Sequence, residues 1–419
     1  MFGWLRDLTE KERKTMIGCL GGWSLDALDV QLFSFVIPTL LALWGISRAE
    51  AGMLGTVTLL ISAFGGWAAG ALSDRYGRVL VLQITILWYA IFTFLCGWAQ
   101  DFNQLFIFRA LQGLGFGAEW SAGAVLMGEV IRDRYRGRAV GLVQSGWAIG
   151  WGAAALLYTA IFAWLPEELA WRTLFWIGLA PALLVFWVRK HVDEPEVFKQ
   201  SASRAPSPGG TFGQLFSVLR APYLATTVKV SLMVTGAQGG SYALSVWLPT
   251  YLRTERGLST LGTGSYLFVH ICGAWVGFIV GAILADAIGR KATFLLSAVG
   301  SALAVVAFIM LPISNETQLL VAAPLGFIIY MMFSPMGTFM TELYPTAVRG
   351  AGQGFCYNVG RAMGALFPFL VGFLSERLAL GSAIVVFAII AYGLQVAALL
   401  ALPETRGRSV ADIPVGAAD

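Results

Sequence analysis

The sequence predicts an all-α membrane protein with twelve transmembrane helices in two six-helix bundles. Of its 419 residues, 57% are hydrophobic and only 12% are charged, whereas soluble domains carry about 25% charged residues. A helix needs about 20 apolar residues to cross the hydrocarbon core of a bilayer. Stretches of this kind occur at approximately residues 16–44, 51–73, 79–99, 103–130, 139–164, 172–189, 222–252, 264–288, 292–313, 318–343, 353–375 and 381–402.

Basic residues in alternate loops predict the orientation of these helices, because short cytoplasmic loops are enriched in lysine and arginine. The segments "SDRYGR", "RDRYRGR" and "VRK" follow the second, fourth and sixth stretches. Intervening loops such as "GISRAE" are mixed in charge. We therefore expect both termini in the cytoplasm, and a multi-pass protein of a bacterial-type cytoplasmic (inner) membrane.

The longest hydrophilic stretch divides the chain into two halves that repeat each other. "GALSDRYGR" from Gly70 matches "GAILADAIGRK" from Gly281, 211 residues later, and such a repeat indicates two similar structural units. The stretch between the halves is rich in proline, glycine and serine, as is typical of a linker. The expected parts are an N-terminal six-helix bundle at 1–192, a cytoplasmic linker at 193–220, a C-terminal six-helix bundle at 221–403 and a cytoplasmic tail at 404–419.

The repeated segment resembles the signature of the major facilitator superfamily, and the resemblance extends over essentially the whole chain. The first copy has the order Gly-x-x-x-Asp-Arg-x-Gly-Arg. Its glycines allow close helix packing, and its aspartate can accept hydrogen bonds from arginine or from a helix N-terminus. We interpret the two copies as a conformational latch, with Gly70, Asp74, Arg75, Gly77 and Arg78 in the first half and Asp286 and Arg290 in the second.

Two aspartates stand inside the first apolar stretch, in "LDALD". Asp26 lies about 15 Å from the cytoplasmic end, near the middle of the membrane, and Asp29 lies one turn further on nearly the same face. A low dielectric and mutual repulsion favour the protonated form of such carboxyl groups. At least one is therefore a candidate proton carrier, and the other could balance a cation as a fixed ion pair. The spacing leaves open which is which.

The fourth apolar stretch contributes two further residues to the expected proton-coupling set. Arg109 is an intramembrane cation, and such a residue almost always faces the protein interior and finds a partner. In proton-coupled members of the superfamily that this chain resembles, the matching arginine helps to govern the protonation of a nearby carboxylate. Glu119 is either a second proton site or gate, or a residue that joins helices by hydrogen bonds.

The second half has its conspicuous charge in "YNVGRAMGALFP", at Arg361. A guanidinium suits a substrate carboxylate because its fork donates two parallel hydrogen bonds. Arg361 could instead lock the two bundles together by pairing with a backbone carbonyl or with an aspartate of the first half. The other expected substrate-binding residues are the neighbours Asn358 and Tyr357 and the weaker candidates Gln238, Tyr242 and Gln144.

A finer resemblance is to the sialate:proton symporter group, carried by "LDALD", "GAEWSAGAVLMGEV", "YNVGRAMGALFP" and "PETRGRS". It implies proton-coupled import of an organic carboxylate, such as sialic acid or a short monocarboxylate, by alternating access. Related aromatic-acid:proton symporters share much of this pattern and are an alternative. The same residues also leave open proton-driven efflux of a hydrophobic compound and a role as a non-transporting membrane sensor.

The sequence argues against several other classes of protein. The glycine-rich segments "GLGFG" and "GWAIGWG" lie inside membrane stretches and not after a strand, which disfavours nucleotide binding. We expect no enzymatic activity, no metal, no cofactor and no nucleic-acid partner. The expected partners are a small organic anion, protons as the driving force and the lipid bilayer, and we expect a monomer. The spacing of residues does not specify which carboxylate is bound.

Overall fold

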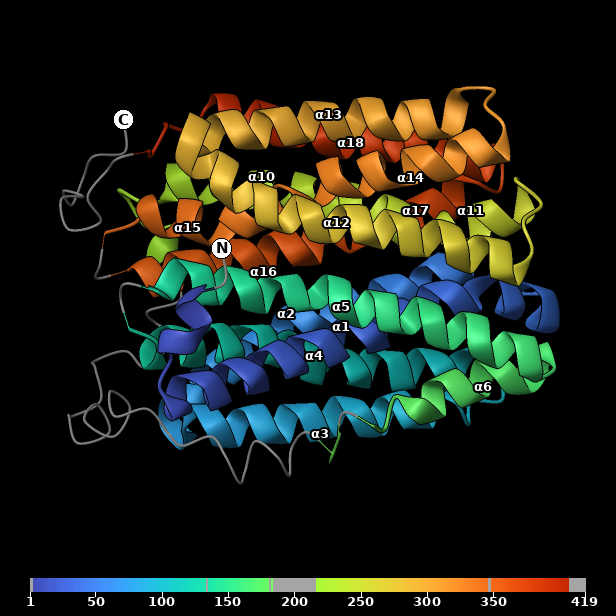
Figure 1. Cartoon of the computed structure of the whole chain (residues 1–419), viewed down its shortest axis with the longest axis horizontal. Helices are drawn as coiled ribbons and strands as arrows, with labels where there is room; N and C mark the ends of the chain where they lie inside the picture. The colour runs from blue at the N-terminus through green and yellow to red at the C-terminus, as the bar shows by residue number, and fades with distance from the viewer. Residues whose placement is uncertain (1–2, 133–134, 181, 184–215, 346–347, 407–419) are drawn as a thin grey trace. The chain divides into compact units, whose positions relative to one another are not determined.

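The computed structural model describes residues 3–132, 135–180, 182–183, 216–345 and 348–406, and these residues form helices joined by short connections (Figure 1). In the first half the elements are the 3-10 helix η1 (Gly3–Asp7), α1 (Glu10–Trp44), α2 (Arg48–Tyr76), α3 (Arg78–Cys96), α4 (Phe102–Val130), α5 (Arg136–Trp164) and α6 (Glu167–Ile177). In the second half they are η3 (Phe216–Leu219), α10 (Leu224–Ser245), α11 (Leu248–Thr254), α12 (Thr260–Ile288), α13 (Arg290–Met310), α14 (Asn315–Tyr330), α15 (Phe333–Glu342), α16 (Arg349–Gly364), α17 (Leu366–Leu374) and α18 (Leu380–Leu400).

The helices follow the apolar stretches expected from the sequence. The stretch at 79–99 becomes α3, and the stretch at 381–402 becomes α18. Part of the sixth stretch, at 172–189, lies outside the described residues. Within the described residues, nine helical segments are long and apolar enough to cross a membrane. The count of twelve and the cytoplasmic position of both termini therefore stay predictions.

Three of the expected stretches are interrupted, and a proline follows each interruption. Proline has no N–H, and its ring clashes with the carbonyl of the residue four positions earlier. Pro249, Pro335 and Pro368 accordingly follow the ends of α10, α14 and α16, which stop four or five residues before them. Pro38 and Pro324, by contrast, lie within continuous helices.

The first of two compact units comprises Met1–Leu32 and Ile61–Pro208. In this unit α3 packs along α4, and α6 contacts α3 and α5. The start of α1 is tied to the end of α4 through Glu12, whose buried carboxylate accepts hydrogen bonds from the backbone N–H and the guanidinium of Arg132. Asp101 caps the other end of α4 by accepting a hydrogen bond of 2.9 Å from the backbone N–H of Gln104.

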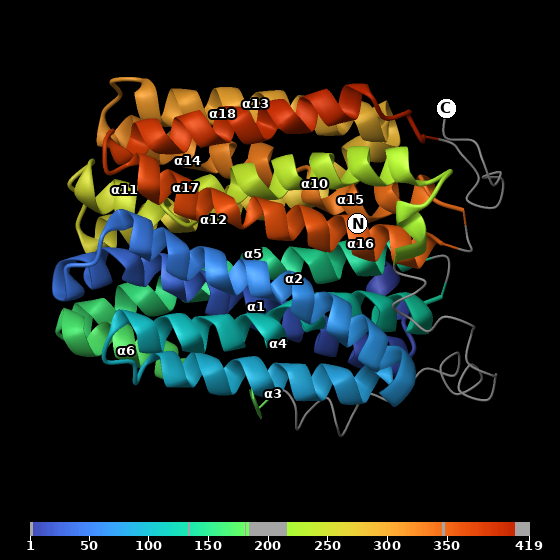
Figure 2. The same cartoon turned by 180° about the vertical axis from the view of Figure 1, so that it is seen from behind.

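The second unit comprises Phe33–Leu60 and Gly209–Asp419. Within it α12 packs along α14, and α10 packs against α16 and α18. Figure 2 shows α18 lying beside α13, and these two helices are in contact. The last part of α1 and the first part of α2 belong to this unit, although the sequence assigned both helices to the first bundle. The expected linker at 193–220 lies largely outside the described residues.

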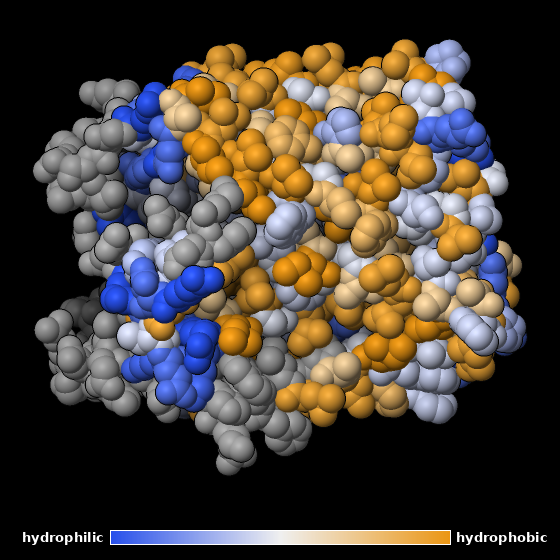
Figure 3. Space-filling model, in the orientation of Figure 1, coloured by the Kyte–Doolittle hydropathy of each residue, from blue (hydrophilic) through white to orange (hydrophobic). Residues whose placement is uncertain are grey.

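The surface is that of a protein surrounded by lipid. Apolar side chains cover the sides of the helices, and hydrophilic ones gather near the helix ends (Figure 3). On α3, for example, Ile84, Leu87, Trp88 and Ile91 are all more than 40% exposed. A contiguous apolar surface of this kind is disfavoured in water and favoured in hydrocarbon.

Candidate functional site

Arg361 lies buried in α16, with 2% of its surface exposed. Its Nη2 donates a hydrogen bond of 3.2 Å to the hydroxyl of Tyr357, one helical turn earlier. The guanidinium carbon also lies 4.9 Å from the centre of the Tyr357 ring, which is a cation–π distance. These two contacts fix the position of the guanidinium and show that Arg361 and Tyr357 share one face of the helix.

Two more of the expected substrate-binding residues lie near this face. Tyr242 of α10 interacts with Arg361 electrostatically and through a side-chain hydrogen bond. Asn358 is 2% exposed, and its Nδ2 donates to the carbonyl of Gly354 at 2.9 Å. Its Oδ1 accepts no hydrogen bond within the described part of the chain. A buried amide oxygen in this state gains free energy, about 1–3 kcal/mol, when a ligand donates to it.

Further aromatic side chains lie near Tyr242 and extend the site. Tyr330 of α14 lies in the neighbourhood of Tyr242. The Tyr330 ring centre lies 5.6 Å from that of Phe278 and 5.6 Å from that of Phe333. We call Phe278, Tyr330 and Phe333 the aromatic cluster. Gln238, on α10 one turn before Tyr242, is also buried, at 3% exposed.

Asp29 is part of a buried polar network in the first unit. The hydroxyl of Thr93 on α3 lies 2.9 Å from Asp29 Oδ2 and 2.8 Å from the carbonyl oxygen of Tyr89, so its single proton can be donated to either acceptor. Gln112 Nε2 donates to Thr93 Oγ1 at 2.6 Å, and Arg109 Nη1 donates to Gln112 Oε1 at 3.1 Å. Two neutral side chains thus connect the carboxylate to the guanidinium.

The other expected site residues of the first unit are Asp26, Gln144 and Glu119. Asp26 is fully buried on α1, one turn before Asp29. Gln144 is half-buried on α5. Its neighbour Trp147 packs against Trp23 of α1, with ring centres 5.1 Å apart. Glu119 lies on α4, but its side chain is outside the described part of the structure.

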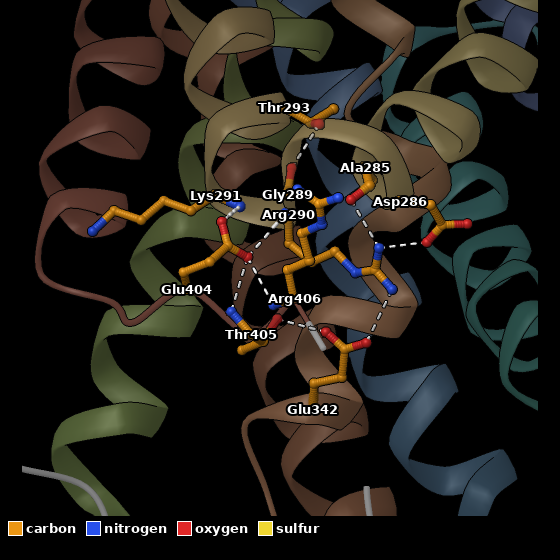
Figure 4. Close-up of polar contacts among 10 residues, drawn as sticks. All are labelled: Ala285, Asp286, Gly289, Arg290, Lys291, Thr293, Glu342, Glu404, Thr405 and Arg406. Atoms are coloured by element: carbon orange, nitrogen blue, oxygen red, sulfur yellow. Dashed lines mark hydrogen bonds and ion pairs between the residues drawn. The ribbon is translucent and has the colours of Figure 1, made fainter. Parts of the chain in front are cut away.

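The second copy of the latch is a cluster of charges at the junction of α12 and α13 (Figure 4). Arg290 donates to Asp286 at 2.5 Å and to Glu342, at the end of α15, at 3.2 Å. Glu342 in turn accepts a hydrogen bond of 2.5 Å from the hydroxyl of Thr405. Asp286 and Arg290, which the sequence placed in the second copy, form an ion pair, and Glu342 and Thr405 join this cluster.

Glu404 holds the N-terminus of α13. Its two carboxylate oxygens accept the backbone N–H groups of Arg290 at 3.0 Å and Lys291 at 3.1 Å (Figure 4). Partial burial raises the pKa of Glu404, but backbone N–H donors, including those of Arg406 and Thr405, outweigh this and hold its pKa below the ordinary value. The carboxylate replaces the helical acceptors that the first turn of α13 lacks.

The first copy of the latch matches the second in its backbone. Gly77 and Gly289 precede α3 and α13 with φ angles of 104° and 106°, a conformation that other residues rarely adopt. At Gly289 a Cβ atom would also lie 2.6 Å from a Glu404 oxygen. The side chains of Asp74, Arg75 and Arg78, and the surroundings of Gly70, lie outside the described part of the structure.

Sequence reasoning missed three residues that these contacts depend on. Glu342 and Glu404 stand in repeated segments, "MTELYPTAVRG" and "LPET", so internal repetition was the available signal. Thr93 gave no signal, because threonine is unremarkable in an apolar helix and its partners lie 19 and 64 residues away in the chain.

Residues 19–368 match the sequence profile of a family described as the Major Facilitator Superfamily. A Cupriavidus pinatubonensis protein described as "Probable 4-methylmuconolactone transporter" is 43% identical, with 99% of this chain and 95% of that protein covered. The "Cis,cis-muconate transport protein" of Acinetobacter baylyi is 33% identical, with 86% and 87% covered. The "Sialic acid transporter NanX" of Escherichia coli is 26% identical, with 90% and 91% covered.

The fold is also similar to that of a solved structure, a bacterial homologue of the human lysosomal transporter Spinster in an inward-facing and unoccupied conformation. The TM-score is 0.72 at 18% sequence identity, and 93% of this chain and 97% of the other are covered. At this level of identity the likeness extends to the fold.

The geometry at Glu404 predicts a pH-dependent loss of stability in Glu404→Gln. The neutral amide binds the two N–H groups of α13 more weakly, so we expect a loss of about 1 kcal/mol, or about 2 °C in apparent Tm, at neutral pH. Since the folded-state pKa of Glu404 is lowered from 4.5, its stabilising contribution is present above pH 4.5 and is lost as the pH falls through the folded-state pKa. Thermal unfolding of the purified protein over a pH series measures both effects.

Glu316→Gln is the matched control, because Glu316 is an exposed glutamate in the first turn of α14. Only the attraction of its charge to the helix N-terminus is lost, so we expect its apparent Tm to fall by less than about 1 °C. Equal destabilisation by the two substitutions, or a Glu404→Gln effect that persists at acidic pH, would contradict the specific role of Glu404.

Proposed function

Because the chain belongs to the Major Facilitator Superfamily, we propose that it is a proton-coupled symporter of a small organic carboxylate. The proposed substrate has a planar frame, either unsaturated or aromatic. Arg361 binds its carboxylate, and the carboxyl groups of Asp26 and Asp29 supply the proton coupling. Transport proceeds by alternating access, in which the site opens to one side of the membrane at a time.

The observation that carries the proposal is the buried guanidinium of Arg361. A cation inside a membrane is costly, and such residues commonly mark a substrate or ion path. Tyr357 holds one Nη group and supports the face of the guanidinium. A carboxylate bound in the guanidinium plane would neutralise the charge and form charge-assisted hydrogen bonds.

The aromatic cluster supports a planar substrate. Its rings reach Arg361 through Tyr242, and an unsaturated or aromatic frame can stack on or meet the edges of such rings. Two relatives are named for muconate and a muconolactone, which are small unsaturated compounds. A third relative is named for sialic acid. Sialic acid and short monocarboxylates are therefore the competing substrates within the same carboxylate class.

The Asp29 network supports the proposed proton coupling. A protonation change at Asp29 alters how strongly its carboxylate accepts the Thr93 hydrogen bond, and Gln112 passes the change on to Arg109. Buried hydrogen bonds strengthen one another in this way at low dielectric. Asp26, one turn away on α1, repels a negative charge on Asp29, so a proton on either of the two carboxyl groups reduces this repulsion.

Thermal-shift measurements on the purified protein test the substrate class. The panel comprises cis,cis-muconate, 4-methylmuconolactone, benzoate, lactate, sialic acid, a neutral sugar and a hydrophobic cation. Ligand binding to the folded state raises the apparent Tm, and we expect the largest rise with the unsaturated and aromatic acids. If only sialic acid or lactate raised the apparent Tm, the substrate would still be a carboxylate, but the proposed planar frame would be wrong. A rise with the sugar or the cation alone would overturn the carboxylate site.

For Arg361→Lys we predict weaker binding of whichever acid binds most tightly in that panel. Lysine keeps the charge but lacks the planar fork, so about 1.5–3 kcal/mol is lost, equivalent to a ten- to hundredfold rise in Kd. The variant should also distinguish the acid from its amide less well than the wild type does. Isothermal titration with both ligands measures the two effects.

Arg256→Lys is the control for this substitution, because Arg256 bonds to Ile313 and Asn315 at a loop outside the site. Its Kd values should match those of the wild type. If Arg361→Lys kept the wild-type ratio of acid to amide affinity while its transport rate changed, Arg361 would be a lock and not the anion site.

For Asp26→Asn we predict loss of proton-driven accumulation with retained exchange of substrate. The amide mimics the protonated acid and cannot release a proton, so the carrier can still move loaded. Uptake under a pH gradient and counterflow without one, both in proteoliposomes, separate the two activities. Asp29→Asn should give a milder or a more general defect, because Asp29 also accepts the hydrogen bond from Thr93.

The control for charge removal is Asp101→Asn. Asp101 is the N-cap of α4, where asparagine is as good a cap as aspartate, so both activities should persist. Equal loss of accumulation and counterflow in a folded Asp26→Asn variant would argue that Asp26 does not carry the coupled proton.

A further inference from the structure

The α16–α17 interruption lies one turn beyond Arg361. The backbone N–H of Ala365 donates to the Arg361 carbonyl at 2.8 Å, and α17 begins at the next residue, Leu366. An unbroken helix would join the N–H of Phe369 directly to the carbonyl of Ala365, four residues earlier. Ala365 is fully buried and Phe369 is half-buried, and an unmet hydrogen-bonding group is costly in such a place.

Thr56 of α2 stands between these two backbone groups. Its hydroxyl donates to the Ala365 carbonyl at 2.6 Å and accepts from the Phe369 N–H at 3.2 Å. One side chain from a distant helix thus bridges the pair that helical geometry would join. A side chain inserted into the hydrogen-bond ladder is a known cause of a kink.

Two further contacts hold the interruption in place. The indole N–H of Trp247, a fully buried residue between α10 and α11, donates to the Pro368 carbonyl at 2.9 Å. The backbone of α2 passes so close that a Cβ atom on Gly52 would lie 2.5 Å from the same carbonyl oxygen. All of these residues belong to the second unit. The interruption is therefore held by contacts with α2 and with the α10–α11 junction.

We propose that Thr56 is a positioning residue for anion binding at Arg361. Its hydroxyl fixes the backbone where α16 ends and α17 begins, and this sets the position in which the end of α16 presents the guanidinium. The inference rests on the proposed function, since it takes Arg361 as the anion site. It goes further by making a residue of α2 a determinant of affinity.

Loss of the hydroxyl leaves the Ala365 carbonyl and the Phe369 N–H without their bridge. Pro368 prevents α16 and α17 from joining into one straight helix, so the direct bond does not replace it. The Phe369 N–H then exchanges faster with solvent protons, and the end of α16 is held less firmly. The site is weakened, although Thr56 does not touch the anion.

The test compares three variants of α2. Thr56→Val removes the hydroxyl at nearly constant volume, and Thr56→Ser retains it. Thr58→Val is the matched control, because Thr58 is fully buried on the same helix and its hydroxyl bonds to Leu54 within that helix, at 3.4 Å. Titration with cis,cis-muconate gives Kd, and hydrogen–deuterium exchange of the peptide spanning 365–374 reports on the interruption without any ligand.

We expect Thr56→Val to raise Kd about tenfold, the effect of one lost hydrogen bond, and to change the exchange of the 365–374 peptide. Thr56→Ser and Thr58→Val should match the wild type in both measurements, and all variants should keep the wild-type apparent Tm within a few degrees. Restoration by serine separates a bridging hydroxyl from a general packing effect.

Unchanged affinity in Thr56→Val would overturn the positioning role, and so would equal weakening by Thr58→Val. Unchanged exchange in the 365–374 peptide would overturn the bridge itself. A wild-type protein that binds none of the acids in the panel would contradict the proposed function instead. The exchange measurement still decides the role of Thr56 in that case, because it needs no ligand.

Discussion

The cost of placing a charged or hydrogen-bonding group in hydrocarbon is the constraint on which the rest of this structure depends. The buried residues Asp29, Arg109 and Arg361 each form a hydrogen bond with a side chain from their own or a neighbouring helix, which lowers this cost. Where α16 and α17 are interrupted, a threonine and a tryptophan side chain donate hydrogen bonds to backbone carbonyl groups and lower the cost there. Each polar residue inside the membrane therefore constrains a second one, and the functional groups inherit their positions from this pairing.

The protein meets this constraint differently at the ends of its helices and in their interior. At the start of α13, Glu404 and Glu342 bind backbone and guanidinium groups through ionic contacts, which suit a rigid connection. In the interior, neutral side chains stand between Asp29 and Arg109. Such a relay can transmit a change of charge at Asp29 to Arg109, as the proposed proton coupling requires.

Hydropathy was sufficient to predict most of the helices, because it follows from the transfer of side chains between water and lipid. The contact of Arg361 with Tyr357 was predictable from helical spacing alone. The interruptions of α10, α14 and α16 were not recognised, although the prolines after them carried the signal. Thr56 and Thr93 were not predictable, since their importance comes from partners on other helices, and spacing along the chain contains no record of these pairs.

The bridge at Ala365 has a consequence for biosynthesis. The residue that completes this part of the backbone lies 309 positions earlier in the chain, so the ribosome makes α2 long before it makes α16 and α17. When the Ala365 carbonyl and the Phe369 amide leave the translocon, their side-chain partner is already in the membrane. A gene rearranged to encode α2 last would deliver these groups into lipid before Thr56 existed. The order of synthesis is thus part of the information that shapes this helix.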